Sequence, residues 1–302
     1  MVIPNTETIT TLSLPDNLAS WLDVWQKLIQ HRLSSVLESA REILFDDDSR
    51  LVFFSDCHRG NRSPIDAFAA NEMLFMQVLT HYFHRGFTYI EVGDGDELWQ
   101  NHNFRDVLRS HWPIFDLLHR FDLQNRLHLI LGNHDVSRWR QNDLTKDGIR
   151  VEEGLTLRHR RTNQRILVTH GHQADIKSDL FSPVSRLMVR HVWRRIQEWG
   201  VVRFFQSRFS NQPLFPNIER RIMAWVAANH QPIICGHTHR AMAAEVGEPA
   251  YFNTGSFIVP NVATGLEIQG GEIALVRWTS NPLTRDVRRQ VLAPPRRLAL
   301  FA

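Results

Sequence analysis

Short apolar runs alternate with helix-like segments through most of the chain, and this alternation limits the fold more than any other feature. Runs of this length that are rich in Val, Ile, Leu and Phe are typical of buried strands. The segments between the first three runs, 66–84 and 104–121, have helical length. A β-α-β-α-β order predicts an α/β fold with a largely buried sheet. The predicted strands are 51–54, 87–92, 127–131, 165–169 and 232–235.

Three segments outside this alternation also carry structural signals. Apolar residues recur at the helical period from Asp16 to about Ala40, which predicts an amphipathic helix that Asp16 can cap. The segment 265–280 is typical of a β-hairpin that turns at Gly270-Gly271. The basic tail, 288–302, is expected to form a surface arm.

The composition is that of an ordinary globular protein. Hydrophobic residues make up 43% and charged residues 22% of 302 residues, which allows a large core. The 35 basic and 32 acidic residues give a net charge of +3, which is too small to indicate a nucleic-acid partner. Two cysteines cannot form a disulfide framework, and residues 1–17 lack a signal-peptide pattern. We therefore expect a cytoplasmic protein.

Each predicted strand is followed by residues of the kinds that bind metals. In an open α/β sheet, ligands bind at the carboxyl ends of strands, so these blocks could converge. In Asp56-x-His58 and His237-x-His239, an extended backbone would send both side chains to one side, where they could hold one ion. Glycines at 93, 132, 171 and 236 are expected to allow sharp turns beneath them. The blocks are Ser55-Asp56-Cys57-His58, Gly93-Asp94-Gly95-Asp96-Glu97, Gly132-Asn133-His134-Asp135, His170-Gly171-His172 and Gly236-His237-Thr238-His239.

The ligand types indicate which metals would bind. A mixture of Asp, Asn and His is harder than a thiolate site and softer than an all-oxygen cage, which favours Mn²⁺, Fe²⁺ or Zn²⁺. With only Asp56 and Asp94 as carboxylate ligands, two divalent ions would keep a surplus of about two positive charges. A phosphate group would neutralise that surplus. The sequence therefore predicts two divalent ions and a phosphorylated substrate.

The five blocks together resemble the signature of the calcineurin-like metallophosphoesterases, from about residue 50 to 257. This resemblance implies an α/β sandwich of two mixed β-sheets flanked by helices. It also implies hydrolysis of a phosphate ester or anhydride by a hydroxide that bridges two divalent ions, with Mn²⁺ the first choice and Fe or Zn as substitutes.

The resemblance also implies a role for each residue of the blocks. One ion would be held by Asp56, His58 and His239, and the other by Asn133, His170 and His237, with Asp94 bridging them. His134 would assist the leaving group. Glu97, which stands where Asp is more usual, would orient His134.

Several assignments near the blocks stay open. His172 competes with His170 as the ligand that follows the fourth strand. Asp96 and Asp135 either support the ligands or are solvated carboxylates. The two cysteines are predicted to be buried thiols beneath the site, because Cys is commonly buried and no third Cys completes a cluster (Cys57, Cys235).

Residues 176–229 interrupt the strand–helix alternation and are predicted to form a small helical cap. The segment is about two helices long and holds eight large aromatics, with nine Lys and Arg against three acids. Its position between the fourth and fifth blocks would place it beside the site, where it could receive a substrate with an apolar part and phosphates. The alternative is a helical pair that packs on the domain. The predicted organisation is a helical extension, 1–48, and a metallophosphoesterase domain, 49–302, that includes the cap.

The substrate itself stays open. A helical insertion here is similar to the lid of UDP-2,3-diacylglucosamine diphosphatases, and Gly93-Asp94-x-x-Glu97-x-Trp99 resembles their second block. Those enzymes typically have Arg in place of His134 and lack a leader helix. A nuclease and a non-catalytic scaffold of the same fold are the competing hypotheses. We expect a phosphorylated small-molecule or lipid-like substrate, with nucleic acid less favoured and peripheral membrane contact through the cap as a variant.

Overall fold

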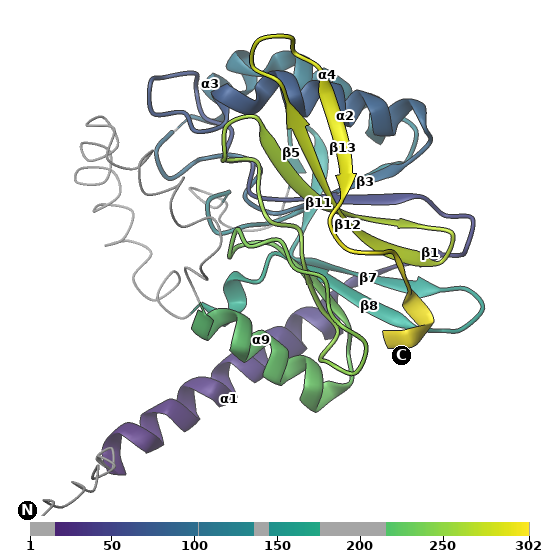
Figure 1. The fold of residues 1–302 in the computed structure, drawn as a ribbon. Helices are drawn as coiled ribbons and strands as arrows, with labels where there is room; N and C mark the ends of the chain where they lie inside the picture. The colour runs from purple at the N-terminus through teal and green to yellow at the C-terminus, as the bar shows by residue number, and fades with distance from the viewer. Residues whose placement is uncertain (1–15, 102, 136–144, 176–215, 302) are drawn as a thin grey trace, which may run out of the picture.

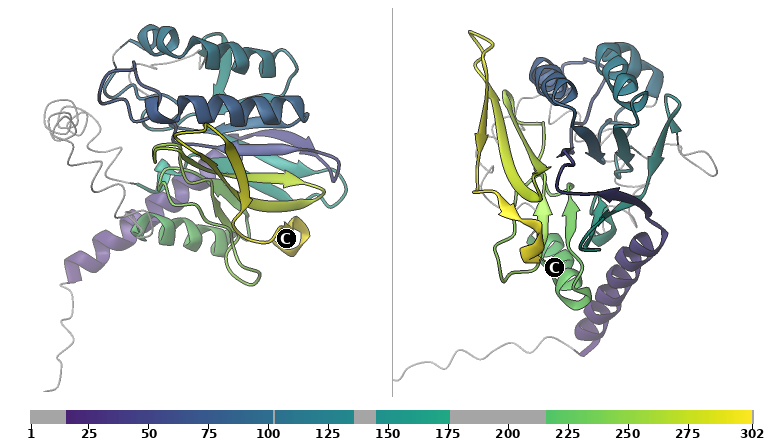
Figure 2. Two further views of the ribbon diagram at one scale, coloured as in Figure 1. Left: turned by 45° about the horizontal axis from the view of Figure 1, so that its top comes forward. Right: turned by 90° about the vertical axis from the view of Figure 1, so that its right-hand side faces the viewer.

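The computed structural model describes residues 16–101, 103–135, 145–175 and 216–301, without the side chains of 16–23 and 216. Two β-sheets pack against each other, and helices cover their outer faces (Figures 1 and 2). Each sheet contains parallel and antiparallel neighbours. The predicted α/β sandwich of two mixed sheets flanked by helices is therefore confirmed.

The larger sheet has nine strands, and its centre supplies three of the predicted strand ends. Its members are β2 (Leu51–Phe54), β3 (Thr88–Val92), β4 (Leu127–Ile130), β5 (Thr145–Lys146), β6 (Ile149–Glu152), β11 (Val262–Gln269), β12 (Glu272–Ser280), β13 (Val287–Val291) and β14 (Arg296–Arg297). The order is β13-β12-β11-β2-β3-β4-β6-β5, and β14 pairs with β12. Strands β2, β3, β4 and β6 run parallel, so their carboxyl ends lie at one edge.

The smaller sheet has five strands and supplies the other two strand ends. Its members are β1 (Arg41–Phe45), β7 (Gly154–His159), β8 (Arg165–Thr169), β9 (Ile233–Cys235) and β10 (Tyr251–Asn253), in the order β1-β7-β8-β9-β10. Strands β8 and β9 run parallel, whereas β7 and β8 are antiparallel.

Helices cover both outer faces of the sandwich (Figure 2). Helices α2 (Glu72–His84) and α4 (Trp112–Asp122) pack on the larger sheet, with α3 (Phe104–Ser110) beside α4. Helices α1 (Asp16–Ser39) and α9 (Pro216–Asn229) pack together, α1 against β7 and α9 against β10. Side chains of β2 alternate between two apolar clusters, because Leu51 and Phe53 lie in one and Val52 and Phe54 in the other. Full burial of such a side chain stabilises the fold by about 1.5–3 kcal/mol.

Most of the predicted elements are confirmed, including the five strands, the helix at 16–40 and the hairpin. Both turn glycines, Gly270 and Gly271, have the positive φ, +63° and +69°, that a tight hairpin turn requires. The helix predicted at 66–84 begins only at Glu72, after a 3₁₀ turn over Ala69–Asn71. The single helix predicted at 104–121 is wrong. It is divided at His111, after which proline occupies the first turn of α4, where its missing N–H costs nothing.

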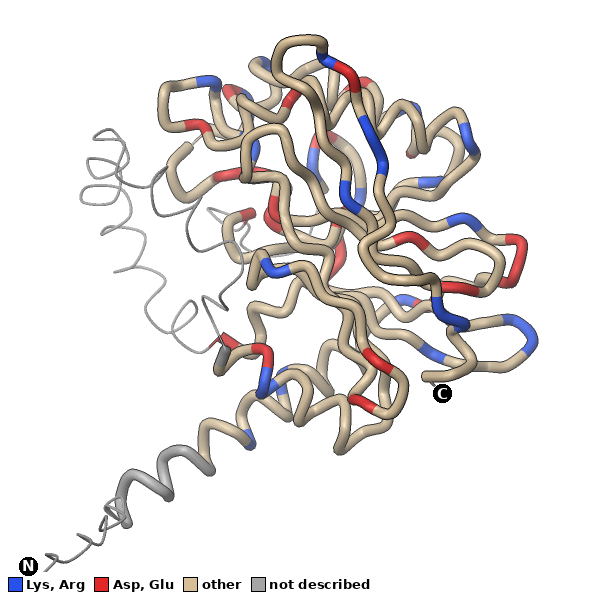
Figure 3. Tube along the Cα trace, viewed as in Figure 1, with Lys and Arg blue, Asp and Glu red and all other residues tan. Residues whose placement is uncertain are grey.

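The expectation of a surface arm at 288–302 is wrong. This segment supplies most of β13, which pairs with β12, and then forms β14 and a 3₁₀ turn over Leu298–Phe301. Leu298 and Phe301 are buried and join the larger core cluster, which holds the tail in place. Strand β13 is an edge strand of the larger sheet (Figure 3), and its residues Arg288 and Arg289 are exposed, with Arg289 paired to Glu267 of β11. Charged side chains on an edge strand disfavour pairing with another chain.

Most of the predicted cap lies outside the described residues. Its last part, 216–229, forms α9, and Trp225 of that helix is fully buried in the core beneath the smaller sheet. The division into 1–48 and 49–302 stays a prediction. Among the helices that the structure describes, none is both long and apolar enough to cross a membrane.

Candidate metal centre

The five polar blocks follow the carboxyl ends of β2, β3, β4, β8 and β9, and they meet at one edge of the sandwich. Three groups of ligand-type side chains form there, each with ligand atoms within 4.8 Å of one another. Two of them consist of predicted ligands, and the third joins His58 to Glu97 and His134. Strands of both sheets contribute, which explains why residues from 56 to 239 come together.

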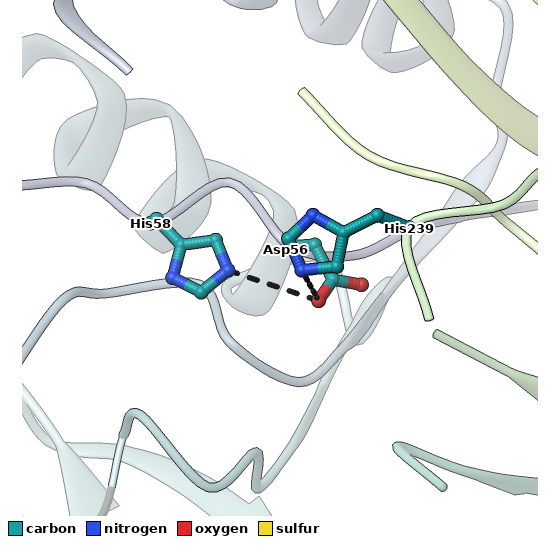
Figure 4. Close-up of side chains that lie close together, drawn as sticks. All are labelled: Asp56, His58 and His239. Carbon is teal, nitrogen blue, oxygen red and sulfur yellow. Dashed lines mark ion pairs between the residues drawn. The ribbon is translucent and has the colours of Figure 1, made fainter. Parts of the chain in front are cut away.

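Asp56, His58 and His239 form the first group (Figure 4). His239 Nε2 lies 3.1 Å from Asp56 Oδ1, and His58 Nε2 lies 3.8 Å from the same oxygen. The three side chains therefore direct one carboxylate oxygen and two imidazole nitrogens at a common point, as the first set of predicted ligands requires.

Asp94, His170 and His237 form the second group. His170 Nε2 lies 3.1 Å from Asp94 Oδ2, and His58 Nε2 of the first group lies 3.8 Å from that same oxygen. The other oxygen, Oδ1, accepts a hydrogen bond of 2.8 Å from the backbone N–H of His134. A single oxygen of Asp94 thus faces both groups, which is the placement that a bridging ligand needs.

Four buried atoms of predicted ligand side chains make no hydrogen bond within the described part of the chain. They are Asp56 Oδ1, His58 Nε2, Asn133 Oδ1 and His170 Nε2. Three of the four lie 3.1–3.8 Å from a polar atom of another predicted ligand, without a hydrogen bond. A buried polar group without a hydrogen bond costs about 1–3 kcal/mol, so four of them need an explanation. Two cations would satisfy all four, and the residues present therefore fit two metal ions.

The second nitrogen of two ligand histidines is fixed by a hydrogen bond. His170 Nδ1 donates to the backbone oxygen of Val92 at 2.8 Å, and His58 Nδ1 donates to Glu97 at 3.1 Å. Each bond leaves Nε2 facing the site. Burial lowers the pKa of His170, but Asp94 outweighs it and raises the pKa to about 9. A metal that binds His170 must therefore displace a proton.

His134 is held by two neighbours. Its Nδ1 donates to both carboxylate oxygens of Glu97, at 2.9 and 3.0 Å, and the Trp99 ring stacks on its face at 4.0 Å and 20°. Trp99 Nε1 donates to the backbone oxygen of Asn133 at 2.7 Å. Burial raises the pKa of Glu97, but His134 and His58 outweigh this and lower it to about 2. The structure thus brings Glu97 to His134, and it adds contacts to His58 and Trp99 that the sequence did not predict.

The backbone at Asp56-x-His58 and His237-x-His239 is not extended, as we had expected it to be. Both pairs lie in loops beyond their strands, and five ligand residues have φ between 49° and 68°, in the left-handed region: Asp56, His58, Asp94, His237 and His239. Non-glycine residues rarely adopt this conformation, and it costs about 1–2 kcal/mol each. The prediction that strand periodicity aligns each pair is therefore wrong.

Two of the four glycines in the blocks allow a neighbouring loop to pack closely against the backbone, and are not required for a sharp turn. A Cβ at Gly132 would overlap the carboxylate and backbone of Asp94, and a Cβ at Gly236 would overlap Ser55 and Asp56. Gly93 and Gly171 do have the positive φ expected of a sharp turn. The ligand loops are thus packed too closely for any side chain at Gly132 or Gly236.

A buried ion cluster lies beneath the ligand loops. Arg59 donates to Asp96 at 2.7 Å and to Glu91 at 2.7 Å, while Lys146 Nζ lies 2.6 Å from Asp96 and 3.2 Å from Asp135. Asp96 and Asp135 belong to two of the blocks and Arg59 directly follows a third, so the side chains of Arg59 and Lys146 hold three loops together. Asp96 and Asp135 are therefore supports and not solvated carboxylates. Arg59, Glu91 and Lys146 had no motif that would predict this role.

Two further residues, His172 and Asp175, lie near the second group, and the first of them was the alternative to His170 as a ligand. The structure places His170 in the ligand group, whereas the His172 ring lies 5.6 Å from the His170 ring and belongs to none of the groups found among the described residues. Asp175 Oδ2 lies 3.4 Å from His237 Nε2. No motif in the sequence singled out Asp175.

Both cysteines are buried, free thiols, as predicted. Cys57 packs in the apolar cluster under α2 and α4, and Cys235 in the core between the sheets. Burial raises the pKa of both thiols, which keeps them protonated and unreactive.

Comparisons with known proteins give similarities of structure alone. No protein-family model and no curated protein matches the chain. Vacuolar Protein Sorting 29 of Cryptosporidium parvum is similar, with 12% identity, a TM-score of 0.39 and coverage of 81% of this chain and 98% of that chain. Vps29 of Entamoeba histolytica complexed with Zn²⁺ has 18% identity, a TM-score of 0.39 and coverage of 81% and 99%. The cold-active protein-tyrosine phosphatase of a Shewanella species has 13% identity, a TM-score of 0.38 and coverage of 84% and 83%. A function must therefore be argued from the side chains of this chain.

Proposed function

We propose that the chain is a metallophosphoesterase of the calcineurin-like kind, which hydrolyses a phosphate ester or anhydride with two divalent cations. One observation carries the proposal: four buried ligand atoms, on loops that follow three different strands, lack hydrogen bonds within the described residues and belong to side chains of one centre. When bound, two divalent cations activate water at neutral pH and neutralise charge on phosphoryl oxygens.

The ligands that we propose are those that the sequence predicts. Asp56, His58 and His239 would hold one cation, Asn133, His170 and His237 the other, and Asp94 Oδ2 both. Imidazole together with a few oxygen donors suits Mn²⁺, Fe²⁺ and Zn²⁺, and Mn²⁺ is our first choice. Neither thiol belongs to the donor set.

His134 would act on the leaving group. Glu97 accepts the hydrogen bond from His134 Nδ1, and Trp99 stacks on the ring, so Nε2 is the nitrogen left to donate to an ester oxygen. A positioned general acid of this kind contributes about 10²–10⁴-fold to a rate. Glu97, held ionised by two imidazoles, keeps the His134 ring in this orientation.

Replacement of the bridging carboxylate tests the proposal. Asp94→Asn removes the charge that faces both ligand groups, and we expect it to abolish Mn²⁺-dependent hydrolysis of an aryl phosphate. Asp286→Asn, an exposed carboxylate between β12 and β13, makes the same chemical change away from the site and should leave the rate unchanged. Full activity of Asp94→Asn would refute the two-cation proposal, and an inactive wild type would favour the scaffold hypothesis.

A further inference from the structure

A pocket of about 260 Å³ opens on one side of the centre. Its walls include His58 and His239 of the first ligand group together with His134 and Glu97. The side chains of the second group do not line it. The pocket therefore adjoins the proposed general acid and one half of the centre only.

Apart from Asp66, the remaining residues of the described walls are apolar or neutral. Ile65, Trp99 and Ile258 supply apolar surface, and Asn101 supplies an amide. Neither Lys nor Arg occurs among the described residues that line the pocket. A phosphate or carboxylate group would find no cationic side chain on these walls.

Glu97 presents a carboxylate to the pocket, whereas the carboxylate of Asp66 is fully buried behind the wall, and both already have donors. Asp66 accepts hydrogen bonds from the backbone N–H of Arg62 at 2.8 Å and of Phe68 at 3.0 Å, and His111 Nε2 lies 3.3 Å from it. Glu97 accepts from His58 and His134. These acids therefore repel an anion without offering a cation a free partner.

The position of His134 indicates which part of a substrate would occupy the pocket. In hydrolysis the P–O bond to the leaving group breaks, a P–O bond to the water oxygen forms, and the departing oxygen takes a proton. If His134 Nε2 supplies that proton, the departing oxygen lies against His134 and the rest of the leaving group extends into the pocket. This step rests on the proposed function.

We propose that the pocket binds the leaving group, and that it takes an uncharged group of about one aromatic ring with a hydrogen-bonding substituent. Ligand pockets typically measure about 300–1,000 Å³, so this one is small. A second phosphate is disfavoured by the two carboxylates, and a diacyl lipid exceeds the volume. The leaving group is thus a small neutral alcohol or phenol.

Two phosphate monoesters of nearly equal shape test the charge requirement. 4-Carbamoylphenyl phosphate and 4-carboxyphenyl phosphate differ by one unit of negative charge at the far end of the ring. We expect kcat/KM of wild type with Mn²⁺ to be at least about tenfold higher for the carbamoyl ester, because the carboxylate would lie near Asp66 and Glu97.

A lysine placed in the wall provides the complementary test. Ile65→Lys should shift the ratio of the two kcat/KM values toward the carboxyl ester by about tenfold or more. Ile258→Lys makes the same change on a different wall, in case the first variant folds poorly. Leu283→Lys, at a site 91% exposed outside the pocket, is the matched control and should keep the wild-type ratio.

The outcomes separate the two claims. Equal kcat/KM for both esters in wild type, or a ratio unmoved by both pocket lysines, overturns the pocket assignment and leaves the hydrolase proposal standing. No hydrolysis of either ester in the presence of Mn²⁺, Fe²⁺ or Zn²⁺ overturns the proposed function itself. A preference for the carbamoyl ester that the pocket lysines reverse supports the pocket assignment.

Discussion

Glu97 contacts both a proposed metal ligand, His58, and the proposed acid, His134. Glu97→Gln should therefore weaken metal binding and lower kcat. The carboxylate accepts from His58 Nδ1 at 3.1 Å and from His134 Nδ1 at 2.9 Å. Oε2 of Glu97 accepts from both imidazoles, and Oε1 accepts from His134 and from the backbone N–H of Trp99. Gln has one acceptor oxygen, so its NH₂ group meets a donor in either orientation. A hydrogen bond to a charged group contributes about 1.5–3 kcal/mol, which corresponds to roughly 10- to 150-fold.

The two imidazoles respond in different measurements. Loss of the bond to His134 lowers kcat on an aryl phosphate at saturating Mn²⁺, and loss of the bond to His58 weakens Mn²⁺ binding by about 10–100-fold in calorimetry. Glu97→Asp keeps the charge on a shorter arm and should preserve one bond but not both. Glu248→Gln, at an exposed site, is the control for the same chemical change.

Unchanged values would refute this reasoning. If Glu97→Gln retains both the wild-type kcat and the wild-type Kd for Mn²⁺, the carboxylate neither orients His134 nor supports His58. A drop in kcat with an unchanged Kd for Mn²⁺ would show that the Glu97 carboxylate acts through His134 alone.

Three further predictions concern single residues. His134→Ala should retain bound metal and lose about 10²–10⁴-fold in kcat, whereas His84→Ala should match wild type; loss of metal would show that His134 is a ligand. Gly132→Ala should lower metal occupancy, measured by metal analysis, because its Cβ would displace Asp94; full occupancy would contradict the packing argument. Burial, followed by Arg41, lowers the pKa of His128 from 6.5 to about 4. The unfolded chain therefore binds this proton first, and the free energy of unfolding should fall by up to roughly 3 kcal/mol as pH drops from 6.5 to 4. Urea titrations of His128→Asn should lack that component, and an identical pH dependence would count against it.

The convergence of the ligand blocks could be predicted from the sequence because it depends on strand ends. Apolar runs mark β2, β3, β4, β8 and β9, and parallel neighbours bring their carboxyl ends to one edge. Strands β1, β6 and β7 are among those that were not predicted, because charged or polar residues interrupt their apolar runs. The prediction of a surface arm at 288–302 was wrong because it relied on the arginines and overlooked Leu298 and Phe301, which are buried.

The details of the centre could not be predicted from local patterns. The left-handed conformation of Asp56 and His58 depends on loops packed against one another and not on their own sequence. The ion cluster pairs Arg59 with Glu91, and Lys146 with Asp96, across distances that no motif spacing encodes. Such tertiary pairs become visible only when the strands are placed.

The number of metal ions that the chain binds tests the central claim most directly. Wild type should be saturated with Mn²⁺, passed through a desalting column and analysed for metal and protein, with Asp286→Asn beside it as a control. Two ligand groups joined by Asp94 Oδ2 predict about two ions per chain in both proteins, and fewer in Asp94→Asn. Wild type without bound metal, or Asp94→Asn that binds as much as wild type, would contradict the account.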